Sequence, residues 1–278
     1  MKIALSIAGS DSGGGAGIQA DLLTFAAHGV HGTTAITAIT AQNTVAVTGW
    51  QALGPQMVRA QIEAVADDME ISALKTGMLA NRAIIEEVAR VISERRLTNL
   101  VVDPVMVAKS GDRLLDAEAE AAYIEHLFPL AALITPNLPE ASALLSRPIT
   151  SVREMKEAAM ELRSLGCRAV LIKGGHLEGD PTDVLWDGAS LHEFTTPRIE
   201  TKNTHGTGCT YSAAIVSRLA HGHDVETSVR GAKQYLTVAI QESYSPGRGH
   251  GPVRHLNSGA VAALGRATGP HPRTLPQT

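Results

Sequence analysis

The residues whose types and spacing most clearly indicate a chemical function form one short segment, residues 203–210, in the C-terminal part of the chain. They read NTHGTGCT. Gly206 and Gly208 let the backbone turn tightly around Thr207, so that several N–H groups can point into one concavity. A helix that begins at about Cys209 adds unpaired N–H groups and the positive end of its dipole, which attract an anion such as a phosphate. The same setting lowers the pKa of a thiol, so we expect Cys209 to provide a thiolate. An anion site beside a base indicates phosphoryl transfer to a hydroxyl, whereas the alternative is a tight strand-to-helix turn with a buried cysteine.

The composition of the chain restricts the class of protein. Of its 278 residues 44% are hydrophobic and only 3% aromatic, so small aliphatic side chains must fill the interior, as suits helices packed on a parallel sheet. A formal charge of −4 without a basic block argues against nucleic-acid binding. Cys167 and Cys209 are too few for a disulfide framework or a zinc cluster and favour the reducing cytoplasm. The apolar run of residues 3–8 is too short for a signal peptide or a membrane span, so we expect a cytoplasmic protein without a membrane partner.

Segments along the chain predict the elements that must position these residues. Short β-prone runs alternate with longer helical patterns, which predicts βαβ units and a right-handed, mostly parallel sheet. The expected strands are residues 3–8, 34–40, 73–76, 100–103, 133–135 and 169–173. The expected helices are residues 16–28, 55–68, 81–94, 116–128, 138–145 and 152–165. An antiparallel hairpin of residues 183–186 and 191–195 follows, and then two long helices from about Cys209 and about Val225.

This pattern predicts one α/β domain over residues 1–257. The tail from Ser258 is expected to be disordered because it lacks an apolar period. In open α/β sheets ligands collect where strands end and loops begin. The glycine, amide and charged residues of the chain fall at these places: residues 9–17, Gln42 with Asn43, residues 75–78, Asp103 with Pro104, Asn137 with Glu140, and residues 173–176. Their shared position indicates one ligand site.

Two common nucleotide-binding classes do not fit the glycine-rich loop of residues 9–17. Residues 15–20 match G-x-G-x-x-A, but a dinucleotide fold also needs an acidic residue about 20 positions further on. No Asp or Glu lies between Asp21 and Glu63, which argues against an NAD-dependent dehydrogenase. The chain also lacks G-x-x-x-x-G-K-[ST], so a P-loop ATPase is excluded. The loop can still let the backbone approach another flat or phosphorylated ligand, and the alternative is a flexible surface loop.

Three residues with oxygen-bearing side chains near the strand ends are candidates for holding Mg²⁺: Asp103, Asn137 and Glu140. Mg²⁺ keeps much of its hydration and needs few carboxylates, so contact through waters is expected. For Glu140 the alternative is an acid in the first turn of a helix, stabilised by the dipole. Lys173, at a strand end, could bind a phosphate, and the alternative is an ordinary lysine at the edge of the sheet. For Lys233 the sequence alone predicts a solvated side chain.

Six motifs in a fixed order connect the chain to a known family. They are residues 8–21 (AGSDSGGGAGIQAD), 40–44 (TAQNT), 75–79 (KTGML), 102–106 (VDPVM), 135–141 (TPNLPEA) and 204–210 (THGTGCT). Together they resemble the hydroxymethylpyrimidine/phosphomethylpyrimidine kinases of thiamine biosynthesis, within the ribokinase superfamily, over residues 2–257. The resemblance implies a ribokinase-like fold and a homodimer. It also implies ATP-dependent phosphorylation of the hydroxymethyl group, then of the monophosphate to the diphosphate.

The resemblance also implies roles for single residues. In sugar-kinase relatives the Gly-x-Gly motif ends in an Asp that acts as the general base, and Cys209 stands at that place here. The N–H groups of Gly206, Thr207, Gly208 and Cys209 would hold the migrating phosphoryl group. Gln42 would hydrogen-bond the aminopyrimidine, because an amide is donor and acceptor together.

Further residues would complete the two sides of the site. The other substrate-binding residues implied by the resemblance are Asp21, Met78, Gly9 and Val105. The residues implied on the ATP side are Lys173 and Lys233, with Asp103, Asn137 and Glu140 for Mg²⁺ and its waters.

Two features separate the chain from neighbouring families. No insertion for the small β-lid of sugar kinases is visible, so loops must close the site, and residues 107–112 are the expected flap. Some relatives that phosphorylate pyridoxal carry a second cysteine in this flap, and none lies between Asp103 and Asp116 here. This absence argues against a pyridoxal or pyridoxine kinase, which is nevertheless the nearest alternative because it has the same fold. A second alternative is a non-catalytic sensor that binds the pyrimidine or its phosphate. The presence of all the expected site residues argues against a sensor.

Overall fold

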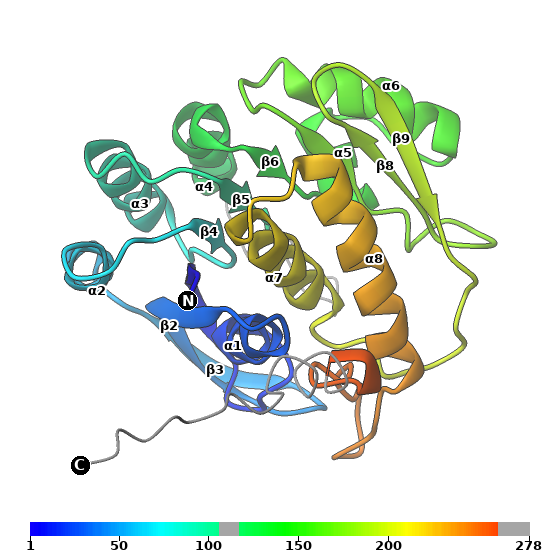
Figure 1. Ribbon diagram of the computed structural model, residues 1–278, viewed down its shortest axis with the longest axis horizontal. Coiled ribbons are helices and arrows are strands. Elements are labelled where there is room, and N and C mark those ends of the chain that lie inside the picture. Colours follow the sequence, from blue (N-terminus) through cyan, green and yellow to red (C-terminus); the bar gives the residue numbers. More distant parts are fainter. Residues whose placement is uncertain (106–116, 261–278) are drawn as a thin grey trace, which may run out of the picture.

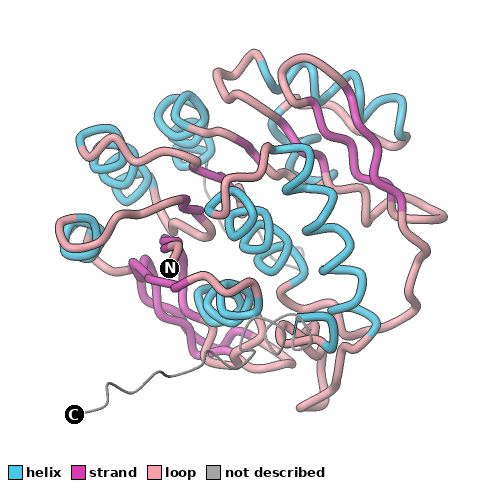
Figure 2. Tube along the Cα trace, viewed as in Figure 1, coloured by secondary structure: helices cyan, strands magenta, loops and turns pink. Residues whose placement is uncertain are grey.

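One nine-stranded sheet forms the centre of the molecule (Figures 1 and 2). The computed structural model describes residues 1–105 and 117–260. Within these residues the strand order is β3-β2-β1-β4-β5-β6-β7-β8-β9. The strands are β1 (Ile3–Ser10), β2 (His31–Gln42), β3 (Val47–Ala52), β4 (Ala73–Thr76), β5 (Leu100–Val102), β6 (Leu133–Ile134), β7 (Val170–Ile172), β8 (Thr182–Trp186) and β9 (Leu191–Thr195).

The middle of the sheet is parallel and its two margins are antiparallel. β2, β1, β4, β5, β6 and β7 pair in parallel, while β3 pairs antiparallel with β2, and β8 with β7 and β9. This confirms the predicted mostly parallel α/β sheet with a C-terminal hairpin. The carboxyl ends of six consecutive strands therefore open at the same edge of the sheet, where a ligand site is expected.

Helices cover both faces of the sheet, as Figure 1 shows. The helices α2 to α6 pack on one face, and α1, α7 and α8 on the other. Their bounds are α1 (Gly17–Ala27), α2 (Pro55–Ala66), α3 (Arg82–Glu94), α4 (Ala117–Ala122), α5 (Leu138–Leu144), α6 (Val152–Arg163), α7 (Thr207–Ala220) and α8 (Val225–Gln241).

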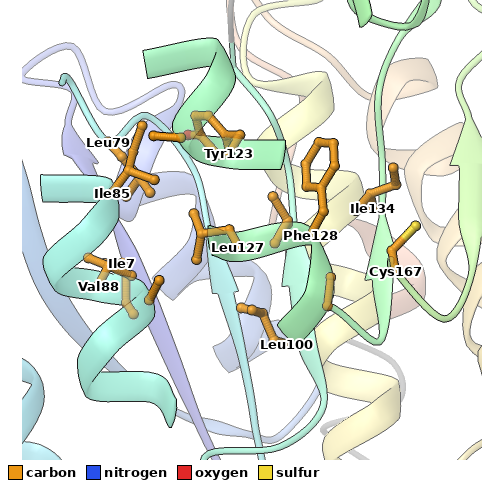
Figure 3. Close-up of a cluster of buried hydrophobic side chains, with 14 of the residues drawn as sticks. Ile7, Leu79, Ile85, Val88, Leu100, Tyr123, Leu127, Phe128, Ile134 and Cys167 are labelled. Atoms are coloured by element: carbon orange, nitrogen blue, oxygen red, sulfur yellow. The ribbon is translucent and has the colours of Figure 1, made fainter. Parts of the chain in front are cut away.

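Two hydrophobic cores separate the helices from the sheet. The larger one, between the sheet and α2–α6, is mostly aliphatic and includes Tyr123 and Phe128 (Figure 3). The smaller one lies between the sheet and α1, α7 and α8 and includes Phe25 and Tyr211. Fully burying one such side chain stabilises the fold by about 1.5–3 kcal/mol. The cores therefore fix the strand ends, on which the site depends.

Strand β3 was not predicted from the sequence. It lies at the edge of the sheet, and β2 extends to Gln42 to pair with it. The side chains of Val47 and Trp50 are 53% and 59% exposed, so no alternation of buried and exposed positions marks this segment. All strands in the described residues belong to the one sheet, and none forms a separate lid.

Two predicted helix bounds also differ. The helix predicted over residues 116–128 is regular only in α4 and continues as a π-helical turn (Tyr123–Leu127) and a 3₁₀ turn (Phe128–Leu130). Pro129 lacks an N–H group and cannot continue the α-helical bonding pattern. Helix α7 begins at Thr207, earlier than the predicted start at about Cys209.

Some predictions fall on residues outside the described part of the chain. The expected flap of residues 107–112 lies there, as do residues 261–278 of the tail. Residues 258–260 are described as a helical turn, in which the backbone N–H of Ser258 donates to the Glu242 carboxylate at 3.0 Å. Among the described helices, none combines the length and apolar character needed to cross a bilayer.

Candidate active site

The predicted anion site forms at the N-terminus of α7. Gly206 caps this helix with a left-handed backbone (φ 76°), and a Cβ there would lie 1.8 Å from the carbonyl oxygen of Gly15, so only glycine fits. The N–H groups of Gly208 and Cys209 belong to the first helical turn and can donate to an anion. Thr207 differs, because its N–H and its hydroxyl both donate to the carbonyl of Thr204 and close the turn.

Cys209 lies half-buried in this first turn. Burial raises the pKa of its thiol to about 11, and the ammonium group of Lys75 and the N–H of Gly17 offset the effect only in part. The expectation that the helix N-terminus lowers this pKa is therefore wrong, because the cost of burying a thiolate outweighs the helix dipole. The role of Cys209 as general base stays a prediction.

A buried ion pair lies beneath this cysteine. Lys75 Nζ donates to Asp21 Oδ1 at 2.8 Å, Ser6 Oγ donates to Asp21 Oδ2 at 2.6 Å, and neither charged side chain is exposed. Burial alone would lower the pKa of Lys75, but the Asp21 carboxylate, with Cys209 and Asp103 nearby, raises it. Asp21 was predicted to contact the substrate. In the structure its side chain is 0% exposed and bonds Lys75 and Ser6, so the carboxylate has no surface open to a ligand.

The other predicted substrate residues lie at the ends of adjacent strands. Gln42 ends β2, Gly9 lies near the end of β1, Met78 follows β4 and Val105 follows β5, and these four strands are neighbours in the sheet. Met78 touches Gly9, since its Cε lies 2.9 Å from the position of a Cβ on that residue. Gln42, Met78 and Val105 are partly exposed. The structure therefore places these four predicted residues over one continuous part of the sheet.

Asp11 and His205 form a pair that was not predicted as part of the site. The Asp11 carboxylate accepts from the N–H groups of Gly13, Gly15 and Ala16 at 2.8, 3.0 and 2.8 Å, and lies 2.9 Å from His205 Nε2. Burial alone would raise the pKa of Asp11, but the hydrogen bonds from His205 and from backbone N–H groups lower it. The pair fastens the glycine-rich loop to the anion site. An Asp at the start of a glycine-rich loop is the sequence signal that could have identified it.

Asp103 and Lys173, predicted on the phosphate side, come together at the start of α7. Lys173 Nζ donates to Asp103 Oδ1 at 2.8 Å, and this aspartate also accepts from Thr135 and Ser212 at 3.0 and 3.1 Å. Burial alone would raise the pKa of Asp103, but the charges of Lys173 and Lys75 lower it. A Cβ on the anion-site glycine at position 208 would lie 3.6 Å from Lys173 Nζ and 3.7 Å from Asp103 Oδ2. A cation and a carboxylate therefore border the anion site directly.

Asn137 and Glu140 form a capping box at the N-terminus of α5. Glu140 accepts from the backbone N–H of Asn137 at 2.8 Å, and the Asn137 side chain accepts from the N–H of Glu140 at 2.9 Å. The alternative of a first-turn helix acid therefore describes the local geometry of Glu140. The described residues contain no group of three His, Cys, Asp or Glu side chains that could enclose a metal ion. The buried Asp103 carboxylate beside Lys173 fits a hydrated Mg²⁺ held largely by phosphates, and does not fit a cage made of protein ligands alone.

Lys233, predicted on the ATP side, pairs with an aspartate of β8 that was not predicted. Its Nζ lies 2.8 Å from Asp183 Oδ2 and 3.2 Å from the carbonyl of Pro181, and Asp183 Oδ1 accepts from the N–H of Gly174 at 2.9 Å. Lys233 thus holds the loop after β7 in place. Its direct contact with a nucleotide stays a prediction.

Comparisons with known proteins agree with this geometry. The family model for phosphomethylpyrimidine kinase matches residues 11–254. The hydroxymethylpyrimidine/phosphomethylpyrimidine kinase of Bacillus subtilis is 48% identical over 255 residues, which cover 91% of this chain and 94% of the relative. The thiamine biosynthesis bifunctional protein ThiED of Geobacter sulfurreducens is 50% identical over 253 residues, or 91% of this chain. The chain spans about half (52%) of the length of that bifunctional relative.

Solved structures show the same fold. The ADP complex of Bacillus subtilis pyridoxal kinase is 42% identical with a TM-score of 0.86, covering 92% of this chain and 97% of that one. The phosphomethylpyrimidine kinase of Clostridium difficile is 43% identical with a TM-score of 0.78, covering 86% of this chain and 100% of that one. The predicted ribokinase-like fold is thereby confirmed, and the chain belongs to the phosphomethylpyrimidine kinase family.

Proposed function

We propose that the protein phosphorylates hydroxymethylpyrimidine with ATP and then phosphorylates the monophosphate to the diphosphate, in thiamine biosynthesis. The observation that carries this proposal is the glycine-capped N-terminus of α7, with Cys209 in its first turn and the Lys173–Asp103 pair at its border. An anion site, a proton-accepting group and a charged pair for phosphate and metal are the components that phosphoryl transfer needs. Family membership supports the same reaction.

In the first reaction the hydroxymethyl oxygen bonds to the γ-phosphorus of ATP, the bond from that phosphorus to ADP breaks, and the hydroxyl proton moves to the thiolate form of Cys209, which becomes a neutral thiol. The N–H groups at the start of α7 donate to the phosphoryl oxygens as their charge is redistributed. In a loose transition state the proton leaves late, so positioning contributes more than the strength of the base. Because burial raises the pKa of the Cys209 thiol to about 11 in the free protein, the thiolate that this step needs is the minor form near neutral pH.

The phosphate side is proposed to hold Mg²⁺·ATP. Asp103, with Asn137 and Glu140 through waters, would hold the ion, and Lys173 would donate to a phosphate oxygen. When bound, Mg²⁺ neutralises part of the charge on the phosphates. Lys173 and Asp103 are 2.8 Å apart in the structure, so binding can either add ligand contacts to this pair or exchange their mutual contact for them. Lys233 would support the loop at Gly174 beside the nucleotide.

The substrate side is proposed to bind the ring of the pyrimidine. Gln42 would hydrogen-bond its amino group and ring nitrogen, and Gly9, Met78 and Val105 would contact its faces and edge. Asp21 would not contact the ring; it would act indirectly, by holding the Lys75 side chain beneath the substrate side. We also propose a homodimer in the cytoplasm, with residues 1–257 as its single domain; the mass of the protein in solution tests the dimer.

Phosphorylation of pyridoxal is the second candidate activity. It is favoured by one specific observation, the TM-scores of 0.86 to the pyridoxal kinases of Bacillus subtilis and Staphylococcus aureus. The identities to these structures are 42% and 33%, and 48% to the hydroxymethylpyrimidine/phosphomethylpyrimidine kinase of Bacillus subtilis. The sequence similarity is therefore higher to a pyrimidine kinase.

Mass spectrometry of the products tests both activities. The protein is mixed with Mg²⁺·ATP and, separately, with hydroxymethylpyrimidine, its monophosphate and pyridoxal. We expect monophosphate and diphosphate from the pyrimidines and little pyridoxal phosphate; pyridoxal phosphate alone would reject the pyrimidine assignment.

In the same assay Cys209→Ala should lose about 100-fold in turnover, the usual contribution of a positioned base. Turnover near that of the wild type would remove Cys209 from that role.

A further inference from the structure

The side-chain amide of Gln42 lies between two polar groups. In the structure its nitrogen Nε2 is 3.3 Å from His205 Nε2 and its oxygen Oε1 is 3.3 Å from Thr40 Oγ1. The two ends of an amide are told apart by their hydrogen-bond partners, and here the partners favour the opposite assignment. The backbone of Gln42 is fixed as well, because the Ser12 hydroxyl accepts from its N–H at 2.7 Å and donates to its carbonyl at 2.8 Å. The position of the amide is therefore set, and only its orientation, oxygen or nitrogen toward His205, remains to be decided.

The Asp11 carboxylate decides the orientation on one side. Asp11 Oδ2 lies 2.9 Å from His205 Nε2, and an ionised carboxylate can only accept. Nε2 must therefore carry a hydrogen. Protonated Nε2 has no lone pair, so a Gln42 N–H group cannot donate to it, whereas the amide oxygen Oε1 can share its hydrogen with Asp11 as the longer, weaker contact at 3.3 Å.

Thr40 decides the orientation on the other side in the same way. Its hydroxyl has one proton, which is donated to the carbonyl of Ser10 at 2.8 Å. Toward Gln42 the Thr40 oxygen can then only accept, and its partner must be the amide nitrogen Nε2. A half-turn of the amide exchanges oxygen and nitrogen with little change in the heavy-atom positions. Both neighbours favour the rotamer with Oε1 toward His205, since the opposite one sets two donors against each other.

We propose that the Asp11–His205 pair is a positioning device that holds the Gln42 amide with its oxygen toward the anion site, and thereby directs the hydroxymethyl group of a bound aminopyrimidine toward Cys209. The proposal rests on the pyrimidine kinase function proposed above. An amino group next to a ring nitrogen presents a donor beside an acceptor, and a glutamine amide pairs with this edge through two hydrogen bonds, as it does with adenine.

The orientation of the Gln42 amide matters because the groups on the pyrimidine ring follow in a fixed order. The ring carbon that bears the amino group is bonded directly to the carbon that bears the hydroxymethyl group, and the ring nitrogen lies on its other side. With Oε1 toward His205, the amino group and then the hydroxymethyl group point to the side from which the chain continues to Gly206 and Cys209. The reversed amide would point the hydroxymethyl group away from the anion site. Pyridoxal has no amino group beside a ring nitrogen, so this device contributes nothing specific to its binding.

Substitutions of His205 test the proposal, because they should lower kcat/KM for a substrate with the amino group more than for one without it. His205→Phe keeps a flat ring but removes the donor, and His205→Gln retains a donor. His250→Phe is the matched control, because this histidine lies on a neighbouring loop and its ring contacts the carbonyl of Lys202. Each variant is assayed with hydroxymethylpyrimidine and with the analogue that lacks the amino group. Two good hydrogen bonds to a base edge are worth about 1–3 kcal/mol, or about 5- to 150-fold.

We expect His205→Phe to lose about 10- to 100-fold in kcat/KM for the aminopyrimidine and less than about threefold for the analogue. His205→Gln should recover most of the loss, and His250→Phe should behave as the wild type. Equal losses on both substrates would overturn the proposal, because a purely structural role affects both alike. ¹⁵N NMR of the histidine rings supplies a readout that needs no turnover: a hydrogen on Nε2 of His205 is expected, and its absence would overturn the proposal. This spectrum also decides the orientation if the wild type phosphorylates neither pyrimidine, a result that would reject the proposed function instead.

Discussion

Two lysine–aspartate pairs lie beneath the two sides of the site and have the same 2.8 Å separation, but water reaches them differently. Lys75 and Asp21, below the substrate side, are 0% exposed in both side chains. Lys173 and Asp103, on the phosphate side, are 15% and 3% exposed. Lys75 comes from β4 and Asp21 from α1, whereas Lys173 and Asp103 both follow strand ends at the edge where ligands bind.

The difference separates a pair that supports the site from a pair that can exchange partners. Breaking a fully enclosed pair leaves an uncompensated charge with no water to solvate it, so that pair persists through the reaction. The Lys173 side chain is partly exposed, and its ammonium group lies beside Gly208 of the predicted anion site. The arrival of phosphates and Mg²⁺ can therefore replace the contact between Lys173 and Asp103 without opening the core.

The largest effect expected from this comparison is on stability. Lys75→Met leaves the Asp21 charge buried without an ionic partner, with one hydrogen bond from Ser6, and should lower the free energy of unfolding by about 3–5 kcal/mol. Lys173→Met leaves Asp103 with hydrogen bonds from Thr135 and Ser212 and should cost much less. Chemical denaturation of both variants measures the two values.

The matched control for this experiment is the double variant Lys75→Met with Asp21→Asn. It removes both charges and keeps an oxygen that accepts from Ser6, so most of the lost stability should return. A double variant as unstable as Lys75→Met would show that the lysine acts by packing, and the contrast between the two pairs would then rest on shape and not on charge.

The sequence predicts the parallel centre of the fold because its strands are apolar runs between turn signals. Strand β4 was predicted with its observed bounds, residues 73–76, and β5, β6 and β7 to within a few residues. Strand β3 escaped prediction because Val47 and Trp50 point to solvent, and pairing at a sheet edge leaves no pattern in such a segment. Helix periodicity likewise could not reveal that α4 passes into a π-helical turn.

For the site, the sequence located residues better than it assigned their partners. Topology brings strand ends together, so Asp103 and Lys173 could be placed at one site although 70 residues separate them. Which lysine neutralises which aspartate depends on packing between helix and strand. For that reason Asp21 and Lys233, predicted as ligand contacts, were not recognised as halves of buried pairs. The pKa of Cys209 was misjudged for a similar reason, since local sequence shows the helix N-terminus but not the burial.

The second effect concerns catalysis and should appear in the phosphate-side pair. Asp103→Asn removes the carboxylate proposed for Mg²⁺ and should lower kcat/KM by about 100-fold. The asparagine oxygen can still accept from Thr135, so the free energy of unfolding should change by less than in Lys75→Met. Turnover at several Mg²⁺ concentrations, with denaturation of the same samples, checks both statements. A variant that keeps its activity but loses as much stability as Lys75→Met would assign Asp103 to the support of the fold and end the distinction between the pairs.

The smallest effect expected is on the pKa of the Cys209 thiol, which depends on the charges of the substrate-side pair, Lys75 and Asp21. Lys75 lowers the pKa of this thiol and Asp21 raises it by a smaller amount, against a value of about 11 set mainly by burial. The double variant Lys75→Met with Asp21→Asn removes both influences, so the pKa should rise, because the influence of Lys75 is the larger of the two. The rate of alkylation by iodoacetamide as a function of pH measures it. Cys167→Ala serves as the background, since burial also raises the pKa of Cys167 to about 11. A fall in the pKa of Cys209 would mean that Asp21 dominates the charge at the thiol, so that the pair beneath the substrate side would oppose proton removal by Cys209 and not assist it.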